Sequence, residues 1–152
     1  ISGYTLADLE KRWKIDVIDL KPDVLSILIG TNDIDKHLKQ EHTEFDFTEW
    51  ANRYRHLLEC TLTANPNIRI ILCSPFAAFT GRMKESKDFE KREFGCIHLP
   101  FNHMFNQLLK DMPTSKDNYW IWDGIHPTPA GHKRMADMWI QQCEKIFNVI
   151  KK

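Results

Sequence analysis

Apolar residues follow two different spacings along this chain of 152 residues, and each spacing predicts one kind of element. Asp23–Ile29 is nearly all apolar, which is typical of a strand buried on both faces of a parallel sheet. Ile68–Cys73 is a second run of the same kind. Elsewhere, apolar residues recur every three or four positions, as they do on one face of a helix. Strands alternating with helices predict an α/β fold with a parallel sheet between helices.

Capping residues indicate where the main helices begin. Thr5 can cap a helix over Thr5–Asp19, and Pro22 stops it. Asp46 and Thr128 can cap two further helices. The apolar faces that we expect in the core comprise Leu6, Leu9, Trp13 and Val17; Phe47, Trp50, Tyr54, Leu57, Leu58 and Thr61; and Met135, Met138, Trp139, Cys143, Ile146 and Phe147.

The pattern is least regular over Phe76–Gly95. Lys84–Phe94 is highly charged and is interpreted as a short surface helix. Cys96–Leu99 is interpreted as a short third strand, and Met104–Leu109 as a helix.

Composition excludes several classes of function. The 21 basic side chains balance the 21 acidic ones, so no positive field attracts nucleic acid or an acidic membrane. The longest apolar run, Val24–Ile29, is too short to span a bilayer. We therefore expect no nucleic-acid partner and no membrane span. A chain of this length with 42% hydrophobic residues predicts a single domain.

The cysteines show neither zinc-type spacing nor a C-x-x-C pair. Cys73 lies in an apolar strand and Cys60 on an apolar helix face, so both are expected to be buried free thiols. Cys96 and Cys143 are the other two.

The segment from Asp123 to His126 carries the strongest chemical signal. A carboxylate three residues before a histidine can accept from one imidazole nitrogen and leave the other free to take a proton. Pro127 restricts the backbone of His126 and helps to aim the ring. This is the general-base half of a nucleophilic hydrolase. The alternative is that Asp123 only caps a turn before the last helix.

A second motif, Gly30-Thr31-Asn32-Asp33, follows the first strand. Gly30 permits a tight turn, and the Asn32 amide can donate to a developing oxyanion. Asp33 is expected to brace the loop. The alternative is a β-turn without chemistry. Both motifs are expected in loops beyond strand ends, where α/β folds bind ligands.

Together with Ile1-Ser2-Gly3-Tyr4-Thr5, these two motifs resemble, in this order, the later sequence blocks of the SGNH (GDSL-type) esterase and acylhydrolase family. The resemblance is strongest at Pro22–Asp33 and Tyr119–Trp139. It implies a flavodoxin-like, three-layer α/β/α fold. It also implies that Asp123 and His126 are catalytic, that Gly3 and Asn32 form the oxyanion hole, and that no metal or organic cofactor is needed.

The first block of that family, a Gly-Asp-Ser with the nucleophilic serine, is not among these residues. Ser2, Ser26 and Ser74 lack a suitable motif around them. We therefore expect residues 1–152 to be the C-terminal, larger part of a single SGNH domain whose nucleophile segment is missing, inactive by itself. In the family the strand with the serine is central in the sheet, so its absence would expose an apolar seam.

The resemblance implies a small-molecule ester substrate with a short acyl group, and O-acetyl groups on carbohydrate are the preferred choice. Trp120, Trp122 and Phe79 could stack on a sugar ring, although aromatic residues more often pack in the core. A lysophospholipid or thioester substrate is open. The rival hypothesis is a catalytically inactive α/β fragment or module that only binds a ligand or partner.

One acidic and histidine-rich stretch could suggest a metal site. It contains Asp33, Asp35, His37, Glu41 and His42, but no helix-borne pair of histidines at metal-binding spacing. We interpret it as solvated loop polarity. His132, near the start of the last helix, is interpreted as structural.

Overall fold

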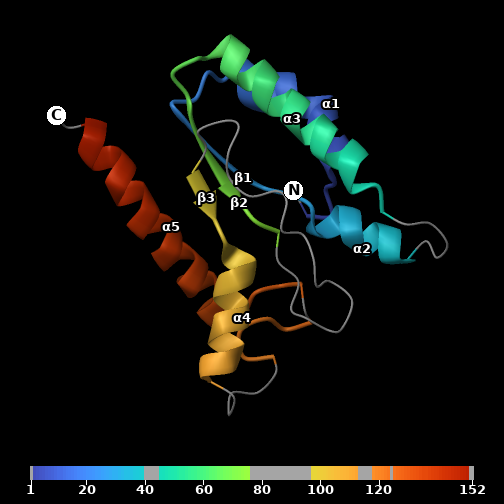
Figure 1. Cartoon of the computed structure of the whole chain (residues 1–152), viewed down its shortest axis with the longest axis vertical. Coiled ribbons are helices and arrows are strands. Elements are labelled where there is room, and N and C mark those ends of the chain that lie inside the picture. Colours follow the sequence, from blue (N-terminus) through green and yellow to red (C-terminus); the bar gives the residue numbers. More distant parts are fainter. Residues whose placement is uncertain (1, 40–44, 76–96, 113–117, 124, 151–152) are drawn as a thin grey trace. The chain divides into compact units, whose positions relative to one another are not determined.

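The computed structural model describes residues 2–39, 45–75, 97–112, 118–123 and 125–150. It divides into two compact units. The first comprises Ile1–Cys73 and Lys87–His98, and the second Ser74–Ser86 and Leu99–Lys152. Figure 1 labels the helices and strands along the chain.

A parallel strand pair forms the centre of the first unit. β1 (Val24–Leu28) runs parallel to β2 (Arg69–Cys73), with Val24 opposite Arg69 and Leu28 opposite Cys73. The strand order is β1-β2-β3, where β3 is Ile97–Leu99. All three strands were predicted from the sequence, and the parallel pairing with flanking helices confirms the α/β class.

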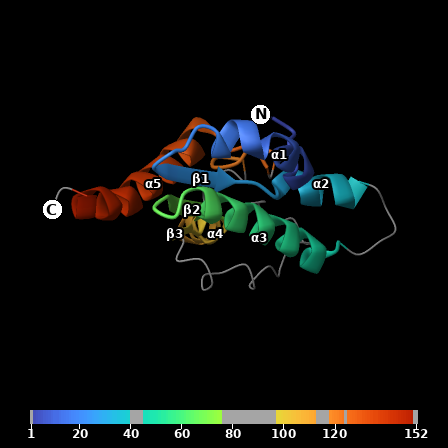
Figure 2. The same ribbon diagram turned by 90° about the horizontal axis from the view of Figure 1, so that it is seen from above.

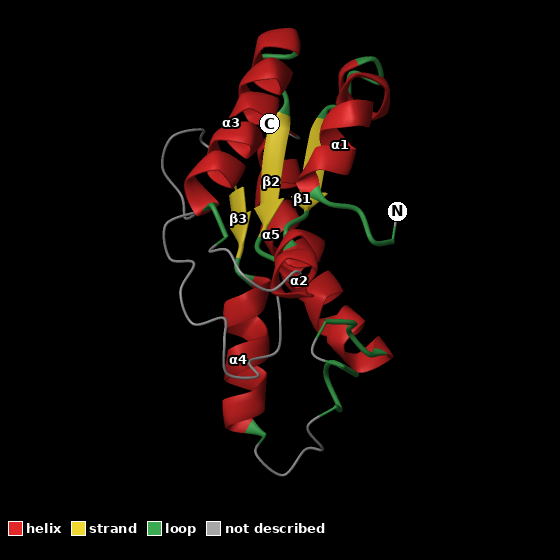
Figure 3. Ribbon diagram, turned by 90° about the vertical axis from the view of Figure 1, so that its right-hand side faces the viewer, coloured by secondary structure: helices red, strands yellow, loops and turns green. Residues whose placement is uncertain are grey.

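Two long helical segments pack against this strand pair. The first is α1 (Leu6–Trp13), which continues into η1 (Lys14–Ile18), a turn of π-helix; the second is α3 (Phe47–Ala64). The Trp13 indole N–H donates to the Thr61 hydroxyl at 2.9 Å and ties the helices together. Figure 3 shows both helices running alongside the strands. Their shared core comprises Leu6, Trp13, Val17, Ile27, Tyr54, Leu57, Leu58, Ile68 and Ile70.

β1 is less buried than its sequence predicted. Ile27 is its buried residue, whereas Ser26 is exposed and Leu28 is 44% exposed. The expectation of a strand covered on both faces is therefore wrong for β1. The reason is its position, because β1 lies at the edge of the described sheet. β2, which is central, buries Ile70, Ile71 and Cys73.

The sequence suggested a loop at Gly30–Asp33, but the structure places this motif at the start of a helix. α2 (Thr31–Lys39) begins directly beyond the end of β1 (Figure 2). The Ile34 N–H donates to the Gly30 carbonyl at 3.1 Å and closes the first helical turn. Gly30 has φ +119°, a backbone conformation that favours glycine. The strand therefore turns into the helix at Gly30, and Asn32 and Asp33 lie in the first turn of α2.

The second unit contains α4 (Phe101–Asp111) and α5 (Pro129–Ile150). α4 is longer than the predicted Met104–Leu109 and begins just after Pro100. Thr128 precedes α5, as predicted, and its hydroxyl oxygen accepts from the Gly131 N–H at 3.1 Å. Phe105 and Cys143 are buried in this unit.

The cysteine expectations are met in part. Cys73 is a buried free thiol, as predicted, but Cys60 is exposed, because its position on α3 faces away from the core. Cys143 is also a free thiol, and Cys96 lies outside the described residues, as does Lys84–Phe94.

In the part of the chain that is described, every helix is too short or too polar to cross a membrane.

Candidate active site

A short hairpin-like loop in the second unit carries Asp123 and His126. Backbone hydrogen bonds close it at two levels: Trp122 N–H donates to the His126 carbonyl at 2.9 Å, and Thr128 N–H donates to the Trp120 carbonyl at 3.0 Å. Asp123 and His126 therefore lie at the tip of a loop whose two sides are fixed to each other.

The first turn of α5 supports the base of this loop. The Thr128 hydroxyl donates to the Tyr119 carbonyl at 2.7 Å. Gly131 packs so closely that a Cβ on it would lie 2.2 Å from the Trp120 carbonyl oxygen. A glycine is therefore required where the helix meets the loop.

Asp123 holds His126 through the backbone and the side chain at once. Its Oδ1 accepts from the backbone N–H groups of His126 at 2.9 Å and Ile125 at 3.1 Å. Its Oδ2 lies 2.7 Å from His126 Nδ1. The His126 backbone N–H, then the His126 ring, then the Ile125 N–H lower the pKa of Asp123 to about 2. The carboxylate is thus charged and fixed, and it orients an exposed imidazole.

This geometry can support general-base chemistry. With Nδ1 engaged by the carboxylate, Nε2 is the ring nitrogen that can accept a proton from a nucleophile. The structure therefore brings together the two residues that the Asp-x-x-His spacing singled out.

The first unit holds the other predicted site residues. Asn32 Nδ2 donates to the Tyr4 carbonyl at 3.0 Å, so the segment with Gly3 contacts the start of α2. Gly3 has φ +78° and is exposed. Gly3 and Asn32, which are 29 positions apart in the sequence, are therefore neighbours through Tyr4.

Asp33 braces this arrangement, as the sequence suggested. It accepts from the Leu6 backbone N–H at 3.0 Å through Oδ1 and at 3.2 Å through Oδ2. The Trp50 indole N–H also donates to Asp33 Oδ1, at 3.0 Å. The sequence assigned Trp50 only to an apolar helix face. No local signal pairs an indole with a carboxylate 17 residues away.

The candidate sugar-binding aromatic residues differ in exposure. Trp120 is 4% exposed, and its ring contacts Tyr119 edge-to-face and lies 5.7 Å from Arg134 Cζ. It packs in the protein and presents no open ring face to a ligand. Trp122 is 61% exposed and directly precedes Asp123. Phe79 lies outside the described residues.

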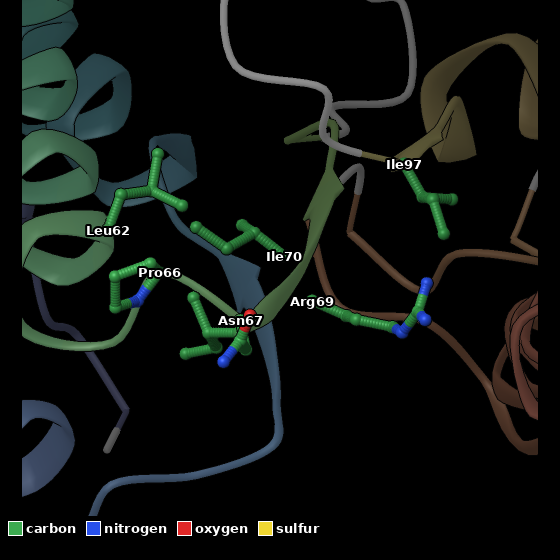
Figure 4. A pocket seen from close by; sticks show the side chains of 7 residues that line it. Leu62, Pro66, Asn67, Arg69, Ile70 and Ile97 are labelled. Atoms are coloured by element: carbon green, nitrogen blue, oxygen red, sulfur yellow. The ribbon is translucent and has the colours of Figure 1, made fainter. Parts of the chain in front are cut away.

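A hollow of about 320 Å³ lies elsewhere, at the beginning of β2 (Figure 4). It is lined by Leu62, Pro66, Asn67, Ile68, Arg69, Ile70 and Ile97. Because β1 and β2 are parallel, this is the opposite end of the strands from Gly30 and α2. The hollow is thus distinct from the predicted site residues of the first unit.

Within the described ranges, no three His, Cys, Asp or Glu side chains gather closely enough to hold a metal ion. Asp33, Asp35 and His37 lie on α2, not in a loop as expected, while Glu41 and His42 lie outside the described residues. His132 is exposed on α5.

Comparison with known proteins gives a consistent result. The sequence profile of the GDSL-like lipase/acylhydrolase family matches residues 1–134. An acetylxylan esterase from Geobacillus stearothermophilus is 31% identical over 158 residues, which cover 93% of this chain and 68% of that protein.

Solved structures show the same likeness. A putative GDSL-like lipase from Parabacteroides merdae is 33% identical, with a TM-score of 0.74 over 93% of this chain and 69% of that chain. The acetylxylan esterase from Geobacillus stearothermophilus has a TM-score of 0.69 at 28% identity, over 93% of this chain and 68% of that chain. These likenesses confirm the predicted α/β fold of SGNH hydrolases.

Proposed function

This chain belongs to the GDSL-like lipase/acylhydrolase family, and we propose that it is the larger part of a serine esterase that removes short acyl groups, with O-acetyl groups on carbohydrate as the preferred substrate class. One observation carries the proposal above the others. It is the hydrogen bond between Asp123 Oδ2 and His126 Nδ1, at 2.7 Å, in a loop closed by its own backbone. A carboxylate that orients an imidazole in this way is the base half of a catalytic triad.

In the proposed reaction, His126 Nε2 takes the proton of the serine hydroxyl as the serine oxygen attacks the ester carbonyl. The protonated ring then gives that proton to the leaving alcohol, and an acyl-serine remains. Water attacks the acyl-serine with His126 again as base, which releases the acid and restores the serine. Asp123 keeps its charge throughout and stabilises the imidazolium.

The oxyanion of each tetrahedral intermediate needs fixed donors. We assign the Asn32 side-chain amide and the Gly3 backbone N–H to this role. One amide hydrogen of Asn32 is engaged by the Tyr4 carbonyl, and the other can donate to the oxyanion. An oxyanion donor contributes roughly 3 kcal/mol to transition-state stabilisation.

The nucleophilic serine is proposed to come from a segment outside these 152 residues. No serine in the sequence follows a Gly-Asp pair. The edge position of β1 in the described sheet supports the proposal, because its outer backbone N–H and C=O groups can pair with a further strand.

The acyl and alcohol parts of the substrate are inferred from two observations. One relative is an acetylxylan esterase, which favours acetyl groups on a sugar. Trp122 is 61% exposed and directly precedes Asp123 in the sequence, and an indole face suits stacking on a sugar ring.

The test uses the full-length protein and a panel of nitrophenyl esters of increasing acyl length together with acetylated sugars. We expect acetyl esters to be hydrolysed fastest and His126→Ala to lower kcat by about a thousandfold or more. His132→Ala is the matched control, because His132 is also exposed but lies on α5. Equal activity of the two variants would refute the role of His126. No hydrolysis of any ester by the wild type would favour a binding module.

A further inference from the structure

We propose that Asp33 is a positioning residue which, held by Trp50, sets the spacing between the two oxyanion donors. The inference rests on the assignment of Gly3 and Asn32 to the oxyanion hole and names what keeps them in register. Asp33 itself is not proposed to touch the substrate.

Packing does not hold Gly3 in place. It is exposed, and a Cβ built on it would find no heavy atom within 4 Å. Its φ of +78° is accessible to glycine without strain, so the backbone there has other conformations of similar energy. The direction of the Gly3 N–H therefore depends on the hydrogen bonds of the residues that follow it.

Those hydrogen bonds come from two consecutive residues of α2. Asn32 donates to the Tyr4 carbonyl at 3.0 Å, and Asp33 accepts from the Leu6 N–H at 3.0 Å. Leu6 is fully buried and begins α1. The segment with Gly3 is thus anchored to the same helical turn that carries the Asn32 amide.

A carboxylate suits this position for an electrostatic reason. Asp33 lies in the first turn of α2 and accepts from the first residue of α1. Two helix N-termini, each with partial positive charge, therefore face the same anionic group.

Trp50 fixes the carboxylate from a third element. Its indole N–H donates to Asp33 Oδ1 at 3.0 Å. The Trp50 ring is stacked on Tyr54, with centroids 5.3 Å apart and planes 9° apart, and Tyr54 is buried in the core. The indole thus holds the Asp33 carboxylate in one orientation relative to α3. The carboxylate in turn holds the Leu6 N–H.

Loss of this donor should affect catalysis more than substrate binding. Oxyanion donors act when they lie about 2.7–3.1 Å from the developing charge, and small misplacements cost rate. A carboxylate without its indole partner can rotate about its side-chain bonds and weaken the bond to Leu6. The Gly3 N–H then shifts relative to Asn32, and the oxyanion of the transition state is stabilised less. The bound ester carries no such charge, so kcat should fall while KM stays unchanged.

The experiment compares Trp50→Phe with Trp13→Phe in the full-length protein, with nitrophenyl acetate as the probe. Both variants keep an aromatic ring and lose one indole hydrogen bond, because Trp13 donates to Thr61 at 2.9 Å in the same core cluster. Asn32→Ala is measured alongside them. Thermal unfolding of each variant shows that it is folded at the assay temperature.

We expect Trp50→Phe to lower kcat by about tenfold or more at unchanged KM, and Trp13→Phe to stay within about twofold of wild type. Asn32→Ala should lower kcat by about a hundredfold or more. If Trp50→Phe matches Trp13→Phe while Asn32→Ala still lowers kcat, the positioning role is wrong and the proposed oxyanion hole stands. If Asn32→Ala leaves kcat unchanged, both are overturned.

Discussion

Gly131→Ala should have two opposite effects on stability at the base of the loop that carries Asp123 and His126. Gly131 is the third residue of α5, and alanine is favoured over glycine inside a helix by roughly 1 kcal/mol. The added Cβ, however, would lie 2.2 Å from the Trp120 carbonyl oxygen, where ordinary contact needs 3.4 Å or more. It would also press on Pro127 Cβ at 3.2 Å and on Phe105 Cε1 at 3.3 Å.

The steric effect should win. The Trp120 carbonyl is backbone, so relief requires the helix and the loop to separate by about 1 Å or more, and overpacking of this kind costs about 1–3 kcal/mol. Separation also weakens the Thr128 N–H bond to Trp120, which contributes about 1 kcal/mol. Against the helix-propensity gain, the net loss in free energy of unfolding is about 2 kcal/mol, or roughly 4–8 °C in Tm for a protein of this size.

The assay is thermal unfolding of the full-length protein, with kcat for nitrophenyl acetate measured well below the lower Tm. Ala136→Gly, on the exposed side of α5, is the control that gives the size of the propensity effect in the same helix. We expect both variants to lower Tm, and only Gly131→Ala to lower kcat, since its loop carries Asp123 and His126. A rise in Tm for Gly131→Ala would refute the close contact with Trp120.

Three further predictions follow from the same site. The pKa of Asp123 is lowered to about 2 in the folded protein, so the stability that its hydrogen bonds contribute is present above the unfolded pKa near 4 and lost as pH falls toward 2. The Tm difference between wild type and Asp123→Asn should therefore shrink as the pH falls from about 4 to 2; a difference that stays constant over this range would contradict the pairing. Trp122→Ala should raise KM for acetylated xylo-oligosaccharides by about tenfold while leaving KM for nitrophenyl acetate within about twofold, and an equal rise for both would mean that the ring does not stack on sugar. A polypeptide confined to residues 1–152 should hydrolyse none of these esters, and measurable turnover that His126→Ala abolishes would show that the nucleophile is within it.

The sequence by itself determined those features whose interactions are local. Asp46 accepts from the Glu49 N–H at 2.8 Å, and Thr128 accepts from the Gly131 N–H, so helix starts could be predicted from residues three positions apart. The Asp123–His126 pair is local in the same sense, because one tight turn brings the two side chains together. Nearly continuous runs of apolar residues likewise predicted both strands of the parallel pair.

Burial was decided by the tertiary structure. The apolar run of β1 predicted a strand covered on both faces. Sheet order cannot be read from such a run, and β1 lies at the edge of the described sheet. Trp120 and Trp122 are only two positions apart, yet Trp120 is buried and Trp122 is exposed. The chain passes from the interior of its unit to the surface between these two residues. Cys60 was expected in the core and is exposed, because the face of α3 that is buried carries Tyr54, Leu57, Leu58 and Thr61.

The partners through which Asp33 braces the segment with Gly3 were also beyond the reach of local pattern. Asp33 meets Leu6 across 27 positions and Trp50 across 17. Hydrogen bonds at such separations form only after strands and helices have packed, because chain folding, not residue spacing, brings these atoms within 3 Å or so of each other. The sequence thus predicted which residues carry the chemistry, and only the tertiary structure decided which residues hold them in place.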